Sequence, residues 1–442
     1  MVLAHTFGER YELPIPLALF VAAGAATVLV SFVLVLRART AGHAPLEAAD
    51  VVPARRQRPA AGLALVVLLL AVATVGLTGT QEVTTNLAPL LFWLVAWIVV
   101  PLTCGLIGDW TKPVNPFAAL ARFGDDPGLR KAVLARKAPL EWTFGWWPAV
   151  GLYVLLVLGE LVFNLDATKP ASVGAVLLVY SVTCFVSGLL FGPSFAERGE
   201  VFSGLYDTWG RLGARRFGAP GREGFTGGLD VPFEVSWSRT VFVLLLLVSV
   251  NFDGLLATPQ WQSYERSTIG LDAPGLRAFR VASLFALIAA GLLLFGLFAR
   301  ASARAGRHGT GFLPSLTGLL PSLVPIAWGY LFAHSLQYVL TDGQLLLPVA
   351  VNPGYDSLPR PGWAVDFDPS TTLLPNSFYW YVSVLVIVAV HVLAVVLAHR
   401  VLASRAPDEA TARRSEYPWL VAMVAYTALS LFLIAQPLTQ GG

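Results

Sequence analysis

The chain has 442 residues, of which 56% are hydrophobic and 13% are charged, and its 30 Lys and Arg nearly balance its 27 Asp and Glu. Because soluble globular proteins carry about 25% charged residues, this composition excludes an ordinary soluble domain. The mean hydropathy of +0.67 excludes intrinsic disorder and a nucleic-acid-binding role. It indicates a multi-pass protein of the cell (inner) membrane whose main partner is the lipid bilayer.

Uncharged apolar runs recur along the whole chain. A helix needs about 17 to 25 such residues to cross a hydrocarbon core about 30 Å thick. Ten runs reach that length and predict an all-α fold, a polytopic transmembrane helix bundle that forms a single integral membrane domain over residues 1–442. In chain order the predicted spans are 15–36, 61–80, 87–107, 146–163, 171–192, 240–257, 279–299, 313–340, 378–399 and 418–436.

The basic residues predict the orientation of the bundle. The first, third, fifth, seventh and ninth connections between spans carry 24 of the 30 Lys and Arg. Because cytoplasmic connections retain basic residues, these five connections are expected on the cytoplasmic side and both termini outside the cytoplasm. Residues 1–10 lack the features of a cleavable signal peptide, so the first span is expected to act as the insertion signal.

Three connections are long. The cytoplasmic loops 108–145 and 193–239 alternate basic residues with Phe, Leu and Trp, which predicts either short interfacial helices or solvated loops. The extracytoplasmic loop 341–377 is rich in Asp and Pro and is expected to be irregular. Val-Asn-Pro occurs at 114–116 and again at 351–353. This match is short enough to arise by chance, but with five spans in each half it is also typical of the inverted repeats of secondary transporters.

Ionisable side chains inside the membrane are candidates for function, because each costs about 2.5 to 3.5 kcal/mol on insertion scales. Four of them in the predicted spans form a candidate set of metal ligands: Glu160, Asp253, His334 and His391. Carboxylates and imidazoles suit Zn, Mn or Fe, and such a metal could activate a bound water. We expect Asp253, His334 and Glu160 to converge on one outward-facing cavity, with His391 at its floor.

Further polar residues are expected near this pocket. The residues predicted at its mouth are His5, Glu9, Glu12, Gln337 and Tyr338. The eighth run, which is the longest, contains Pro321 and Pro325, thirteen and nine residues before His334. Prolines free backbone carbonyls and bend helices, and membrane proteins tolerate such bends beside polar cavities. We therefore expect a bend in this helix next to the pocket.

The same histidines and carboxylates also have interpretations without such a metal. Each histidine could form a hydrogen bond between helices, and each carboxylate could reach the membrane interface. His391 and His399 lie eight residues apart, about 12 Å along a helix axis. This spacing could instead carry two haems, with His334 as a second ligand of the outer one. His399 adjoins Arg400 and is otherwise expected at the interface.

Several segments of the chain together resemble a known family. They are the opening at 5–17, the Asn115-Pro116 pair, the segment 334–338, His391, and the closing segment 417–437. With them the chain resembles a group of actinobacterial multi-pass membrane proteins often labelled fenitrothion hydrolase. The resemblance extends over the whole chain and implies cleavage of an organophosphorus triester. It carries over no catalytic residue.

Three interpretations of the function stay open. The leading one is an integral membrane protein with an outward-facing polar, metal-binding pocket, which the resemblance would make a phosphotriester hydrolase. A small apolar substrate could reach that pocket through the bilayer. The alternatives are a secondary transporter with five-plus-five topology and a haem or quinone electron-transfer subunit. On all three we expect His334 and His391 to matter more than His43 or His308, which lie in predicted cytoplasmic connections.

Overall fold

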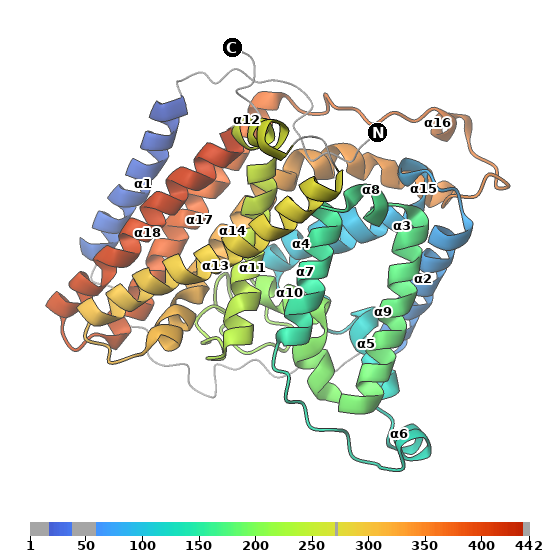
Figure 1. Cartoon of the computed structure of the whole chain (residues 1–442), viewed down its shortest axis with the longest axis horizontal. Coiled ribbons are helices and arrows are strands. Elements are labelled where there is room, and N and C mark those ends of the chain that lie inside the picture. The colour runs from blue at the N-terminus through green and yellow to red at the C-terminus, as the bar shows by residue number, and fades with distance from the viewer. Residues whose placement is uncertain (1–16, 38–58, 270–272, 436–442) are drawn as a thin grey trace. The chain divides into compact units, whose positions relative to one another are not determined.

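A computed structural model describes residues 17–37, 59–269 and 273–435 (Figure 1). These residues form helices and their connections and contain no β-strand, which confirms the predicted all-α fold. Eight helical segments within them are long and apolar enough to cross a membrane, so the chain is a multi-pass helical membrane protein. They are Ala61–Thr78, Leu87–Ile107, Pro170–Phe191, Trp237–Leu256, Pro274–Ala305, Phe312–Val351, Asn376–Arg405 and Glu409–Ala435.

The other two predicted spans contain shorter apolar helices. Val21–Val30 lies within the first predicted span and Trp147–Leu161 within the fourth. The count of ten spans and the position of the termini therefore stay predictions. His5, Glu9 and Glu12 lie outside the described residues.

The helices group into two compact units. Unit 1 consists of Met1–Glu47, Pro232–Gln337 and Thr371–Gly442, and unit 2 consists of Ala48–Val231 and Tyr338–Ser370. Six of the ten predicted spans fall in unit 1 and four in unit 2, because the first span groups with the last five. The division into units therefore differs from the five-plus-five division of an inverted repeat.

Unit 1 is packed around its last helix. Its helices are α1 (Leu17–Arg37), α11 (Trp237–Leu256), α12 (Pro259–Tyr264), η5 (Glu265–Ile269), α13 (Ala273–Ala305), α14 (Phe312–Asp342), α17 (Asn376–Arg405) and α18 (Glu409–Ala435), the end of α14 belonging to unit 2. α18 packs against α1, α13 and α17. A core cluster that includes Tyr330, Ile387 and Leu431 joins α14, α17 and α18. Ser383 Oγ on α17 also donates a hydrogen bond of 3.2 Å to the Ala333 carbonyl on α14.

α14 continues as one helix through the predicted bend. Pro321 and Pro325 lie inside it, and both are buried. A proline in a membrane helix leaves a backbone carbonyl without its usual donor, and neighbouring helices make this tolerable by shielding the site from lipid. The burial of this stretch shows that α14 lies inside the protein and not at the lipid surface.

Unit 2 is built around α2, α5 and α9, which pack closely together. The unit also contains a π-helix of ten residues, η3, and π-helical segments are rare and often found at functional sites. Its helices are α2 (Pro59–Thr78), η2 (Val83–Thr85), α3 (Leu87–Pro89), η3 (Leu90–Val99), α4 (Val100–Ile107), α5 (Pro116–Gly124), α6 (Pro127–Leu134), α7 (Trp147–Leu161), α8 (Asn164–Ala167), α9 (Pro170–Phe191), η4 (Phe195–Gly199), α10 (Val201–Gly210), η6 (Gly343–Leu345), α15 (Leu346–Val351) and α16 (Gly362–Val365).

Both predicted cytoplasmic loops contain helices. α5 and α6 lie in the first, and η4 and α10 in the second. Apolar side chains of α5 and α10 are packed within unit 2, as the burial of Phe117, Phe202 and Trp209 shows, whereas Phe123 on α5 and Val133 on α6 are 40% and 60% exposed. α5 contacts α9, and α10 contacts α4. The buried faces of α5 and α10 are therefore used for packing inside the protein, and a position of the loop helices at the membrane surface stays a prediction.

The two Val-Asn-Pro segments have the same local role. The Asn115 side chain accepts hydrogen bonds from the backbone amides two and three residues later, at the start of α5. The Asn352 side chain does the same in the turn that follows α15. Asparagine is favoured at helix starts and turns for this reason. Local geometry therefore accounts for both segments without an internal repeat.

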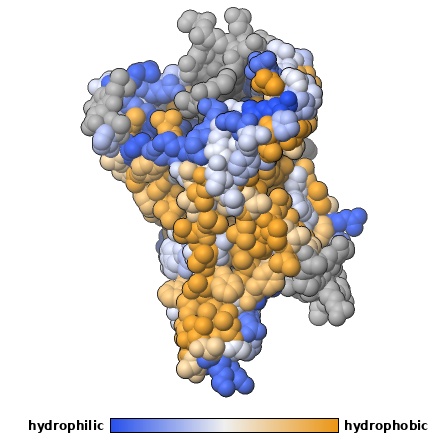
Figure 2. All heavy atoms as spheres, turned by 90° about the vertical axis from the view of Figure 1, so that its right-hand side faces the viewer, coloured by the Kyte–Doolittle hydropathy of each residue, from blue (hydrophilic) through white to orange (hydrophobic). Residues whose placement is uncertain are grey.

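The outer face of α2 and α9 in unit 2 is apolar. The exposed residues on these helices include Leu63, Val67, Val179 and Val182. Figure 2 shows hydrophobic side chains over the middle of this side of the molecule and hydrophilic ones gathered toward its ends. A surface of this kind matches the hydrocarbon core and the two polar interfaces of a bilayer, which supports the lipid bilayer as a partner.

The predicted orientation can be tested at two exposed positions. Asp356 lies in the predicted extracytoplasmic loop with its side chain 89% exposed, and Lys131 is exposed on α6 in a predicted cytoplasmic loop. A membrane-impermeant maleimide added to spheroplasts should label Asp356→Cys and leave Lys131→Cys unlabelled. Cys104 and Cys184 are both buried and should give a low background. Labelling of Lys131→Cys alone would show the opposite orientation.

Candidate functional site

Asp253 and His334 meet in unit 1. Asp253 lies in the last turn of α11, and His334 lies near the end of α14. His334 Nε2 and Asp253 Oδ2 are 2.7 Å apart, and the two side chains are 7% and 20% exposed. Pairing a carboxylate with an imidazole offsets the cost of burying either group at membrane depth. The carboxylate remains the more accessible member of the pair.

Tyr330 packs beside this pair. Its ring stacks on the His334 imidazole with centroids 6.2 Å apart and planes 17° from parallel. The Tyr330 hydroxyl lies against Gly254 on α11, where the Cβ of any other residue would overlap it. A larger residue at position 254 would therefore displace Tyr330 and the imidazole stacked on it. The Tyr330 side chain thus joins α14 to α11 at Gly254, beside the contact made by the pair itself.

A second polar group lies between α11, α17 and α18. Asn251 Nδ2 donates a hydrogen bond to the Tyr426 hydroxyl, and the ring centroids of Tyr426 and His391 are 6.3 Å apart. His391 Nδ1 contacts the Ile387 carbonyl at 2.7 Å, which makes Nδ1 the donor and Nε2 the acceptor of this imidazole. His391 Nε2 is buried and has no hydrogen-bond partner among the described residues. The position of His391 at the floor of a shared cavity stays a prediction.

Glu160 lies in unit 2 and has a different partner. Trp97 Nε1, on the π-helix η3, donates a hydrogen bond of 2.7 Å to Glu160 Oε2 near the end of α7. Among the predicted metal ligands, the structure brings Asp253 and His334 into contact, whereas Glu160 binds an indole. Its convergence with the pair stays a prediction.

The described residues contain no group of three or more His, Cys, Asp or Glu that could hold a metal ion. A catalytic zinc site has three protein ligands and a structural site has four, whereas Asp253 and His334 supply two. The pair alone therefore does not fit a site for Zn, Mn or Fe, and a bound metal or haem stays a prediction. Gln337 and Tyr338, expected at the pocket mouth, follow His334 on α14.

The sequence analysis missed a second carboxylate–imidazole pair in unit 1. His399 Nδ1 and Glu416 Oε1 are 2.9 Å apart, and Glu416 is 2% exposed. Glu416 stands in a charged stretch that was assigned to a connection, but α18 already begins at Glu409 and turns Glu416 inward. Helical spacing could have indicated this burial. Glu416 precedes the apolar residues Trp419 and Met423 by three and seven positions, which places all three on one face of a helix.

A cluster of charged and polar residues in unit 2, in which Asp109 and Thr111 are buried, follows the helical segment that ends at Ile107. Thr111 Oγ1 donates a hydrogen bond of 2.6 Å to Asp109 Oδ1, and Lys112 forms an ion pair of 3.1 Å with Asp207. Burial, helped by the charge of Asp207, raises the pKa of Asp109 to about 6 against the opposing effect of Lys112. Asp109 therefore changes charge in a pH range where an exposed aspartate is already ionised.

This pKa predicts that the stability contributed by Asp109 falls as the pH rises. In the folded protein Asp109 keeps its proton up to a pH of about 6, whereas in the unfolded chain it loses the proton near the ordinary aspartate pKa of 3.8. The contribution is therefore complete below about pH 4 and is lost by about pH 6, with a size of up to about 3 kcal/mol. The melting temperature of wild type relative to Asp109→Asn should fall across this range. A difference that does not vary with pH, as expected for the exposed control Asp356→Asn, would contradict the prediction.

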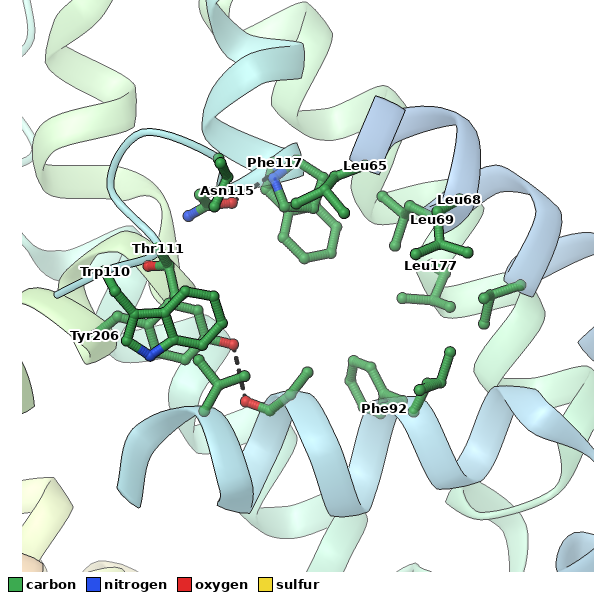
Figure 3. Close-up of a pocket in the computed structure, with 16 residues that line it drawn as sticks. Leu65, Leu68, Leu69, Phe92, Trp110, Thr111, Asn115, Phe117, Leu177 and Tyr206 are labelled. Atoms are coloured by element: carbon green, nitrogen blue, oxygen red, sulfur yellow. Dashed lines mark hydrogen bonds between the residues drawn. The ribbon is translucent and has the colours of Figure 1, made fainter. Parts of the chain in front are cut away.

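Unit 2 also contains an apolar cavity of about 210 Å³. Figure 3 shows leucines of α2 and α9, including Leu68 and Leu177, facing this space opposite Trp110 and Tyr206. The Tyr206 hydroxyl donates a hydrogen bond of 2.8 Å to the Ala96 carbonyl of η3. An apolar lining with a few polar groups is typical of sites for small apolar molecules.

Comparison with known proteins gives no relative from which a function could be transferred. No protein family, curated protein or solved structure matches the chain.

Proposed function

We propose that the chain is an intramembrane hydrolase of neutral organophosphorus triesters, located in the cell membrane. The observation that supports this proposal is the 2.7 Å contact between Asp253 Oδ2 and His334 Nε2 at membrane depth. A positioned carboxylate can act as a general base, provided that it comes within hydrogen-bond reach of the proton that it removes. The resemblance to proteins labelled fenitrothion hydrolase indicates the class of substrate.

In the proposed reaction Asp253 is the general base and His334 is a positioning residue. His334 Nε2–H holds Oδ2 of the carboxylate, which leaves Oδ1 to accept a proton from a water molecule. The water oxygen forms a bond to phosphorus as the bond from phosphorus to the aryl oxygen breaks. The phenolate leaves with the electron pair of that bond, and Asp253 then releases its proton to solvent.

The location of the pair suits an apolar substrate. Aryl phosphotriesters carry no charge, so they dissolve in the hydrocarbon core and can reach a site between membrane helices from the side. Asp253 is 20% exposed at its side chain, which leaves part of the carboxylate accessible. The general base must come within about 2.6 to 3.2 Å of the water that it activates.

The proposal is tested with purified protein in lipid nanodiscs and a 4-nitrophenyl dialkyl phosphate as substrate. We expect saturable release of 4-nitrophenolate above the rate of empty nanodiscs. No release above that rate would contradict the proposal. A chelator in the same assay tests the predicted metal, because loss of activity that zinc restores would require a metal, and unchanged activity would exclude one.

The alternative functions have separate signatures. A haem subunit would show a Soret band in the absorbance spectrum of the purified protein, and a quinone subunit would retain an extractable quinone. A secondary transporter would accumulate a solute in proteoliposomes without turnover of an ester. Hydrolysis without these signatures would favour the proposed enzyme.

A further inference from the structure

We propose that unit 1 contains a path for protons that runs between its two carboxylate–imidazole pairs. The path starts at the first pair, Asp253 and His334, and ends at the second pair, His399 and Glu416. Between them lies the middle cluster, which consists of Asn251, Tyr426 and His391. This function goes beyond the proposed hydrolysis, because it requires transport of a proton along the bundle and not only its transfer to one base.

The first pair is connected toward the middle cluster through Tyr330. On α14, Tyr330 stacks on His334 and precedes it by one turn. On α11, Asn251 and Asp253 are two residues apart, about 3 Å along the helix axis, and their side chains leave the helix on different faces. The Tyr330 hydroxyl is buried and has no hydrogen-bond partner among the described residues. A hydroxyl can donate and accept a hydrogen bond at once, which is what relay of a proton requires.

The middle cluster lies at the level where α11, α17 and α18 meet. Asn251 donates a hydrogen bond to Tyr426, and the Tyr426 ring lies 6.3 Å from that of His391. Asn251 Oδ1 and His391 Nε2 are both buried without a partner in the described part of the chain. Buried polar atoms of this kind are normally bonded to ordered water. The two atoms therefore point to water at the cluster.

The second pair lies farther along the same two helices. His399 follows His391 on α17 by eight residues, and Glu416 precedes Tyr426 on α18 by ten residues. At a rise of about 1.5 Å per residue these separations are about 12 Å and 15 Å. Because α17 and α18 run in opposite directions along the chain, both separations lead from the middle cluster toward the same end of the bundle.

The space beside the second pair suits a water molecule. A cavity of about 10 Å³ is lined by His399, Glu416, Trp419 and Met423, among others, and about 10 to 15 Å³ measured in this way is enough for one water. Within the described residues, Glu416 Oε2 and Trp419 Nε1 are buried without a hydrogen-bond partner. Trp419 lies between Glu416 and Tyr426 on α18, so these atoms continue the path toward the middle cluster.

The chemistry of the path favours a proton over a larger ion. Deep polar groups are costly in hydrocarbon, so the presence of the first pair, the middle cluster and the second pair in one unit indicates a function. The groups are carboxylates, imidazoles and hydroxyls that exchange protons, and a cavity of about 10 Å³ has no room for a hydrated metal ion. Each transfer breaks one O–H or N–H bond and forms another, and the membrane potential supplies the driving force.

The test uses the full chain in liposomes of phosphatidylcholine and phosphatidylglycerol with pyranine inside. Valinomycin and a potassium gradient set a potential that is negative inside, and internal acidification reports proton entry. We expect entry above that of protein-free liposomes in wild type, and a rate at least tenfold lower in Tyr426→Phe and Glu416→Gln. Tyr379→Phe is the matched control, because Tyr379 is buried on α17 and the change removes the same single oxygen, but Tyr379 lies outside the path.

Three outcomes would overturn the proposal. They are no proton entry in wild type, unchanged entry in both path variants, and equal loss in Tyr379→Phe. Tyr426→Phe removes a single oxygen and keeps the ring, and its folding is checked by size-exclusion chromatography before reconstitution. Hydrolysis in detergent requires no gradient and does not involve Tyr426, so Tyr426→Phe should hydrolyse the triester like wild type. Failure of the hydrolase proposal and failure of the proton path are therefore distinguished.

Discussion

Asp253→Asn is expected to lower kcat for hydrolysis of a 4-nitrophenyl phosphotriester by about 100- to 10,000-fold, the range that a general base contributes. The amide keeps the shape of the carboxylate but cannot accept the proton of the attacking water. His334→Gln should have a smaller effect, because glutamine can still donate a hydrogen bond to Asp253 Oδ2. It should also shift the pH dependence of kcat, since a positioning imidazole influences the charge of the carboxylate.

Matched substitutions distinguish the loss of a catalytic group from a general loss of folded protein. His308→Gln changes a histidine in the connection between α13 and α14 and should retain the kcat of wild type. Glu160→Gln changes a carboxylate that binds Trp97 in unit 2, and its kcat tests whether Glu160 also belongs to the site. If His308→Gln reduced kcat as much as Asp253→Asn, predicted depth in the membrane would not identify the residues needed for activity. Full activity in Asp253→Asn would remove the proposed base.

Gly188→Leu is expected to prevent unit 2 from folding correctly. A Cβ at Gly188 on α9 would overlap the Ala121 carbonyl of α5, and a Cβ at Gly124 would overlap the Phe185 carbonyl of α9. The two backbones therefore touch, and small residues at such interfaces are what allow membrane helices to approach closely. A leucine must push α5 away from α9. We expect loss of the monodisperse peak in size-exclusion chromatography and a melting temperature several degrees lower.

The control for this substitution is Gly151→Leu on α7. A Cβ at Gly151 meets no other atom within 4 Å, so the same change of residue adds apolar surface without a clash. This variant should elute and melt like wild type. Equal destabilisation by the two substitutions would mean that loss of helical glycine, and not contact between α5 and α9, sets the effect.

The sequence predicted the positions of the helices in the chain better than it predicted which helices pack together. Runs of uncharged residues identify a membrane helix because length and polarity are imposed by the bilayer. The same runs are apolar on every side, so they carry little information about which face meets which helix. The grouping of α1 with α17 and α18 could not be predicted for this reason. Likewise, helices in the two predicted cytoplasmic loops pack inside unit 2 through residues such as Phe117 and Trp209. The sequence alone does not distinguish these residues from residues that face lipid.

The candidate site could be predicted in part. Asp253 and His334 were predicted as site residues from their depth in the membrane, and the structure places Asp253 Oδ2 2.7 Å from His334 Nε2. Pairing of this kind is expected because an unpaired polar group in hydrocarbon is costly. Depth also selected Glu160, which accepts a hydrogen bond from Trp97. Its convergence with the pair stays a prediction, since the order of spans does not show which helices are adjacent. The burial of Glu416 could not be predicted, because Glu416 lies near the start of a helix among other charged residues. The hydropathy of such a stretch does not show which of its side chains is buried.

Incorporation of oxygen-18 from labelled water tests the central claim most directly. Attack of water on phosphorus places the label in the dialkyl phosphate product, whereas attack on the aryl carbon places it in the nitrophenol. With wild-type protein in nanodiscs, mass spectrometry should find one labelled oxygen in the dialkyl phosphate, formed at a rate that Asp253→Asn lowers by at least 100-fold, in line with loss of a general base. Label in the nitrophenol, or no labelled phosphate above empty nanodiscs, would contradict the proposal that Asp253 and His334 form a hydrolytic site in the membrane.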